Sequence, residues 1–96
     1  MNANVLRVLL TYEDGVMLLF DKPVNVDQAS PPTTWSFNGN TSIQPGSGFN
    51  FDNGTYFILN GFVVPGEPVV IGANDPAART ADGGYVNGGA FTVDDI

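Results

Sequence analysis

The sequence contains no cysteine and no histidine, and only three of its 96 residues are basic. The absence of cysteine excludes disulfides and thiol chemistry, and the absence of histidine excludes imidazole bases and most zinc sites. Ten acidic residues against three basic ones give a net charge of −7, which repels phosphate backbones and anionic lipid surfaces. We therefore expect no nucleic-acid partner and no membrane partner.

The first residues are expected to form a strand and not an export signal. A secretory signal needs an uninterrupted apolar run followed by a small-residue cleavage site. Arg7 interrupts the apolar run, and the charged turn Glu13-Asp14-Gly15 stands where the cleavage site should be. If Met1 is the native start, we expect synthesis without an export signal; otherwise the domain belongs to a larger secreted protein.

The distribution of turn-forming residues along the sequence is typical of an all-β protein. There are 12 glycines and 7 prolines, and Asn-Gly pairs begin at positions 38, 53, 60 and 87, where they favour the positive φ of tight turns. Between them lie short runs rich in β-branched and aromatic residues, none with a sustained helical period. The pattern predicts strands at 4–12, 16–20, 33–37, 41–43, 49–51, 55–59, 68–72 and 90–93.

Three segments receive a different interpretation. Residues 62–64 either continue the preceding strand or begin an edge strand. Residues 24–32 are expected to form a loop, with one helical turn near 26–29. Residues 73–89 are the longest stretch without an assigned element.

About seven strands at this spacing predict a single domain, 1–96, folded as an all-β, immunoglobulin-like β-sandwich. A domain this small needs nearly every large apolar side chain for its core. The expected core residues are Leu6, Val8, Leu10, Leu18, Phe20, Trp35, Phe57, Leu59, Val70, Ile71 and Phe91.

Three segments carry a family resemblance. Residues 18–24 (LLFDKPV), 66–71 (GEPVVI), and the turn 81–84 (ADGG) followed by 90–93 (AFTV) resemble bacterial immunoglobulin-like repeats. The resemblance implies a domain of a bacterial surface protein or an appendage of a phage virion protein, which binds or decorates and does not catalyse. The family has no shared catalytic or binding residues to transfer to this chain.

The acidic residues are weak candidates for chemistry. Glycoside hydrolysis needs two carboxylates about 5–9.5 Å apart in a cleft, whereas the pairs Glu13/Asp14 and Asp94/Asp95 belong to a turn and the chain end. We therefore predict no catalytic residues, no enzyme activity and no cofactor.

Calcium is a stronger alternative, because it binds loop carboxylates and carbonyls. The segment 50–54 (NFDNG) resembles half of a calcium loop, and Asn74, Asp75 and Asp82 lie in one long loop. Such residues are also common turn formers, so no metal ligand is assigned. The glycines at 83, 84, 88 and 89 lack the lysine of a phosphate-binding loop and are interpreted as turns.

The aromatic residues offer a carbohydrate-stacking surface as another alternative. Most aromatics in so small a domain belong to its core, and alternation places Tyr56 and Phe57 on opposite faces. One or two rings therefore remain for a glycan. The full set is Trp35, Phe37, Phe49, Phe51, Tyr56, Phe57 and Phe62. The loops 24–32 and 73–89 are long enough to be binding surfaces.

The favoured function is a non-enzymatic structural or recognition module: an accessory protein that decorates the capsid or tail lattice of a phage, located on the virion surface. Homo-oligomerisation on the particle stays open. The alternative is a repeat of a secreted protein at the bacterial cell surface that binds glycan, with or without calcium. Two pairings also stay open for the amino-terminal strand, with its own sheet or with the edge of a neighbouring one.

Overall fold

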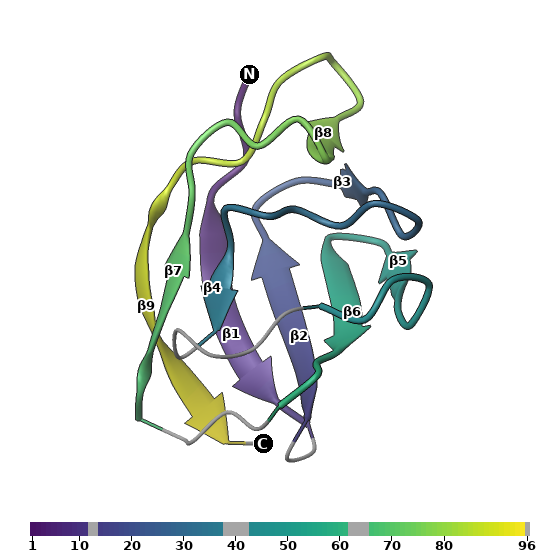
Figure 1. Cartoon of the computed structure of the whole chain (residues 1–96). Coiled ribbons are helices and arrows are strands. Elements are labelled where there is room, and N and C mark those ends of the chain that lie inside the picture. The colour runs from purple at the N-terminus through teal and green to yellow at the C-terminus, as the bar shows by residue number, and fades with distance from the viewer. Residues whose placement is uncertain (12–13, 38–42, 62–65, 96) are drawn as a thin grey trace.

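The chain forms nine β-strands within residues 1–11, 14–37, 43–61 and 66–95, which the computed structural model describes (Figure 1). Every regular element in these ranges is a strand, so the all-β prediction is confirmed. Seven strands share one sheet: β1 (Val5–Leu10), β2 (Gly15–Phe20), β4 (Ser36–Phe37), β5 (Phe49–Phe51), β6 (Gly54–Ile58), β7 (Pro68–Ile71) and β9 (Gly89–Asp95). A second sheet pairs β3 (Val24–Val26) with β8 (Ala78–Thr80). The predicted strand at 62–64 and most of the one at 41–43 lie outside the described residues.

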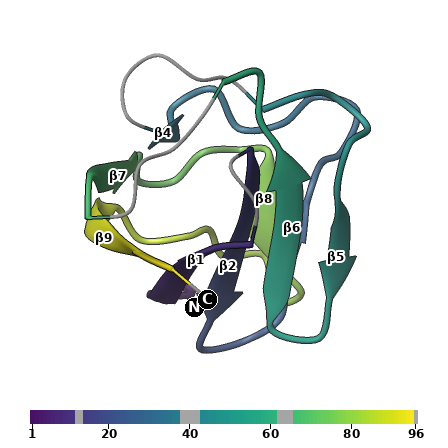
Figure 2. The same cartoon turned by 90° about the horizontal axis from the view of Figure 1, so that it is seen from below.

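The predicted sandwich of two facing sheets is not confirmed. The large sheet has the order β4-β7-β9-β1-β2-β6-β5, and each strand is hydrogen-bonded to the next, so the seven strands form one continuous sheet. β1 joins the two halves of this sheet, because it pairs antiparallel with β2 and parallel with β9. The sheet curls like half of a barrel (Figure 2).

A bulge in β1 changes which apolar residues face the core. Val5 pairs with Phe20 and Arg7 pairs with Leu19, so Leu6 is an extra residue without a partner in β2. Such an insertion re-aims the neighbouring side chains. Val5 is consequently buried, whereas Leu6 is 62% exposed and its prediction as a core residue is wrong.

The hairpins follow from the alternation of apolar residues. Val16, Leu18 and Phe20 are buried along β2, as Phe57 and Leu59 are in and after β6. These positions confirm the predicted strands 16–20 and 55–59. In β7 the same alternation buries Val69 and Ile71, so Val70 is 48% exposed and its placement in the core is wrong.

The two segments interpreted as loops pair with each other. Val24 lies opposite Thr80 and Val26 lies opposite Ala78, which makes β3 and β8 an antiparallel pair. Residues 27–30 contain bends and no helical turn, so the helical turn expected at 26–29 is wrong. Each strand has only three residues, and the two lie more than fifty positions apart along the chain. A local pattern could not reveal this pairing.

The Asn-Gly pairs act differently from the prediction where the structure describes them. The residues with positive φ near the β5–β6 turn and in the 74–88 region are Asp52, Asn74 and Gly83, and neither Gly54 nor Gly88 is among them. Gly54 is required instead by close packing, because an added Cβ would lie 2.5 Å from the Phe51 ring.

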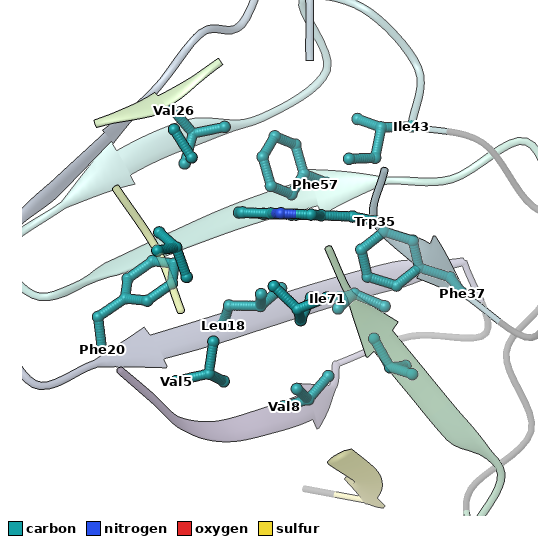
Figure 3. Close-up of a cluster of buried hydrophobic side chains, with 14 of the residues drawn as sticks. Val5, Val8, Leu18, Phe20, Val26, Trp35, Phe37, Ile43, Phe57 and Ile71 are labelled. Atoms are coloured by element: carbon teal, nitrogen blue, oxygen red, sulfur yellow. The ribbon is translucent and has the colours of Figure 1, made fainter. Parts of the chain in front are cut away.

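Trp35 occupies the centre of the core (Figure 3). Its ring meets Phe57 edge-on at 6.3 Å and Phe20 at 6.5 Å. Together with the aliphatic residues of β1, β2 and β7, these rings form one continuous cluster. Phe91 is only partly buried and packs against it. The remaining predicted core residues are confirmed.

Candidate functional site

The structure describes the side chain of one member of each carboxylate pair, Asp14 and Asp94. Asp94 lies on β9 and forms an ion pair of 3.4 Å with Arg7 on β1, and both side chains are about half exposed. The backbone carbonyl of Asp14 accepts a hydrogen bond from the Leu59 N–H at 2.8 Å. Glu13 lies outside the described residues, as does the side chain of Asp95.

The candidate calcium residues point to separate partners. Oδ2 of Asp75 accepts hydrogen bonds from the Thr34 hydroxyl at 2.7 Å and from the Thr34 N–H, while Oδ1 accepts one from the Ala77 N–H. Burial opposes ionisation of Asp75, but these hydrogen bonds outweigh it and lower the pKa of the carboxyl. Among the described residues, no three acidic side chains gather closely enough to hold a metal ion.

Asp82 is instead part of a contact that holds the amino terminus. Its carboxylate accepts a short hydrogen bond from the Thr80 hydroxyl and forms an ion pair with the Met1 ammonium at 3.1 Å. The hydrogen bond from Thr80 and then the ammonium lower the pKa of Asp82. Gly84 is required beside them, because an added Cβ would lie 2.2 Å from the Met1 carbonyl oxygen.

Asparagine side chains continue this contact along the first four residues. The Asn2 amide donates to Asn74 and Asn87, and the Asn87 amide donates to Asn4 at 2.8 Å. The N–H and side-chain amide of Asn4 both donate to Asp21, which lowers the pKa of that carboxyl. This amino-terminal contact is not predictable from the sequence alone, because its polar residues are scattered over distant segments.

The glycine-rich segment is held by Arg79. Its guanidinium donates to the carbonyls of Gly83 at 2.9 Å and Gly84 at 3.2 Å, and lies 4.4 Å from the centre of the Tyr85 ring. The carbonyl oxygens of Gly83 and Gly84 therefore face the Arg79 guanidinium. The segment has the structure of a stabilised turn.

The aromatic residues divide between the core and the outer face of the sheet. Trp35, Phe37 and Phe57 are buried. Phe49, which is 58% exposed, contacts Tyr56 at 5.6 Å and Phe51 at 5.9 Å between ring centres. The rings are tilted by 34° and 53° and form a cluster in which Phe49 is the exposed ring. Phe62 lies outside the described residues.

An open groove of about 480 Å³ lies between residues 29–33 and residues 43–45. Its lining includes Trp35 and Ile43 together with Pro31, Pro32 and Pro45. The indole Nε1 of Trp35 is buried and has no hydrogen-bond partner among the described residues. The described residues that line the groove carry no charge, and no acidic or basic side chain lies among them beside the hydroxyls of Ser30 and Thr33, so this lining offers packing and no acid–base chemistry.

The two ends of the molecule are the remaining candidate surfaces. Met1 lies at one end of the long dimension, and β9 ends at the other (Figure 1). Viewed along that direction, the amino terminus and the end of β9 lie close together (Figure 2). No helix in the described part of the chain is long and apolar enough to cross a membrane.

Comparison with known proteins adds a likeness in fold. No family model matches the chain, and no curated protein matches it. The chain is similar to the N-terminal part of the bacterial S-layer protein SbsC, with a TM-score of 0.58 and 15% identity over 98% of this chain and 24% of that one. It is also similar to a structure of SbsC domains 1–6, with a TM-score of 0.61 and 14% identity over 97% of this chain and 13% of that one. At this identity the likeness concerns the fold alone.

Proposed function

We propose that this chain is a non-enzymatic structural module of a bacterial surface protein. The observation that carries the proposal is the likeness in fold to SbsC, an S-layer protein, over nearly the whole of this chain. This likeness favours the surface-protein alternative over the virion accessory protein that the sequence analysis preferred. No comparison supports a capsid or tail role.

The positions of the chain ends support a module that is joined to others. Because Met1 and the end of β9 lie at opposite ends of the molecule, successive modules can follow one another in a line. The matched SbsC chains are several times longer than this one, since it covers 24% and 13% of them. The partners in this proposal are neighbouring modules of the same surface protein.

The polar side chains support a structural role as well. The carboxylates of Asp21, Asp75 and Asp82 each bind groups of the protein itself, which joins distant segments. A carboxylate committed to internal hydrogen bonds with a lowered pKa is a poor proton donor near neutral pH. Their role in the proposal is to tie loops to the sheet.

Labelling of intact cells tests the proposed location. An antibody raised against the purified domain is applied to intact and to permeabilised cells of the source organism, with a cytoplasmic protein as the control. We expect labelling of intact cells equal to that of permeabilised cells. Labelling that requires permeabilisation would contradict a surface location.

A further inference from the structure

The amino-terminal and carboxy-terminal segments run side by side in the same direction. Val8 pairs with Val93, Leu9 with Asp94 and Leu10 with Asp95 in a parallel ladder. Nearer the amino terminus, Ala3 forms a parallel bridge with Val86. The two segments therefore pair at two places, at Ala3 and from Val8 to Leu10.

The direction of a pull through the chain ends follows from this arrangement. The amino terminus leaves the contact at one end of the molecule, and β9 ends at the other (Figure 1). A pull on the two ends therefore acts along the strands and slides β1 against β9. Sliding strains all hydrogen bonds of the ladder together, whereas peeling breaks them one after another. Because forced unfolding is governed by the unfolding barrier, the sliding direction resists more strongly.

We propose that the β1–β9 contact is a mechanical clamp, with which the module carries tension along a surface protein. This inference rests on the proposed function, because it requires other modules to pull on both ends. The amino-terminal residues reinforce the clamp. The Ala3 N–H donates to the Tyr85 carbonyl at 2.8 Å, and the Ala3 carbonyl accepts from the Asn87 N–H at 2.8 Å.

Across the ladder, Arg7 and Asp94 add an ion pair. The core fixes both strands from one side, because Val8 and Val93 are each at most 2% exposed. β1 is also held by β2 along its other edge. A pull therefore meets two strands that are packed into the body of the domain and cannot separate freely.

Single-molecule force spectroscopy tests the clamp, and the absence of cysteine makes the attachment sites unambiguous. One variant carries a cysteine before Met1 and a second cysteine by Asp95→Cys. The control keeps Asp95→Cys and places the other attachment at Thr11→Cys, beside the same end of the ladder. The first pair slides β1 along β9, and the control peels the strands apart. We expect an unfolding force about twofold or more higher for the first pair. Equal forces, or a higher force for the control, would overturn the proposal.

A backbone substitution gives a second measurement. The Val93 N–H donates to the Glu67 carbonyl on the β7 side, so the N–H of the next residue, Asp94, points toward β1. Asp94→Pro removes this donor. We expect it to lower the sliding force and leave the peeling force of the control nearly unchanged. An unchanged sliding force would overturn the clamp. If Asp94→Pro does not fold, the comparison of unfolding forces between the two cysteine pairs still tests the proposal. Neither measurement depends on where the protein is located in the cell. Cell labelling can therefore contradict the surface location while the force measurements support the clamp, and the force measurements can contradict the clamp while the labelling supports the location.

Discussion

The side-chain amide of Asn50 makes both hydrogen bonds that a neighbouring strand would make with Val26. Its Oδ1 accepts from the Val26 N–H at 3.1 Å, and its Nδ2 donates to the Val26 carbonyl at 3.0 Å. Asn50 lies on β5, at the edge of the large sheet, and Val26 lies on β3 of the small sheet. One side chain therefore joins the two sheets and occupies an edge that would otherwise be open.

Replacing Asn50 by alanine should weaken this junction. The change removes the acceptor of the Val26 N–H and the nearer donor to the Val26 carbonyl, which keeps only the Gln28 amide at 3.4 Å, and we expect the free energy of unfolding to fall by about 1–3 kcal/mol. Amide hydrogen exchange at Val26 should accelerate as well. The matched control is Asn25→Ala, because Asn25 is exposed and loses only a side-chain hydrogen bond to Asn50 at 3.1 Å. Chemical denaturation that gives equal losses for the two variants would contradict this role.

The bulge in β1 predicts opposite outcomes at adjacent positions. Val5→Ala removes buried apolar surface and should lower the free energy of unfolding by about 1–2 kcal/mol. Leu6→Ala alters an exposed side chain and should change it by at most about 0.5 kcal/mol. Urea denaturation of the two variants measures the difference. A larger loss for Leu6→Ala would mean that β1 pairs without the bulge.

Acid should release the contact between Asp82 and the amino terminus. The pKa of Asp82 is lower in the folded protein than its ordinary value of 3.8, chiefly because Thr80 donates to the carboxylate. A lowered pKa gives stability that is fully present above the ordinary value and is lost as the pH falls through the folded one. We expect Asp82→Asn to melt at a lower temperature than the wild type at neutral pH, with a gap that narrows below pH 3.8. A gap that is constant across this range would show that the charge of Asp82 contributes nothing.

Removing the first strand should unfold the domain. β1 lies inside the sheet and pairs with β2 on one edge and β9 on the other, so a neighbour's sheet cannot supply its partner without opening the fold. The alternative pairing with a neighbouring molecule is therefore not supported. We expect a chain lacking residues 1–12 to lose its cooperative thermal transition and its near-ultraviolet circular dichroism. A folded remainder would contradict the central position of β1.

The sequence predicted those parts of the fold that depend on local alternation. Val16, Leu18 and Phe20 repeat with period two, and the segment 49–59 contains a short turn between two apolar runs, so both hairpins were predictable. The bulge at Leu6 was not, because one inserted residue leaves the composition of the strand unchanged. The parallel pairing of Val8 with Val93 depends on residues 85 positions apart, which single-sequence alternation does not relate.

The polar contacts were predictable only in part. Asn50, Asp75 and Asp82 were candidate calcium ligands because their side chains carry oxygen atoms. Asn50 and Asp75 instead bind backbone or hydroxyl groups of a distant segment, and Asp82 binds the nearby Thr80 hydroxyl and the distant Met1 ammonium. Turn-forming residues supply the same oxygens for both purposes, so the sequence could not distinguish a metal ligand from a tie between loops.

Quantitative mass spectrometry of cell-envelope fractions and of purified phage particles from the source organism tests the central claim most directly. The account predicts that peptides of this chain are enriched in the envelope fraction, together with peptides of the other modules of the surface protein. Enrichment in particles at a fixed stoichiometry with a coat or tail protein would contradict it.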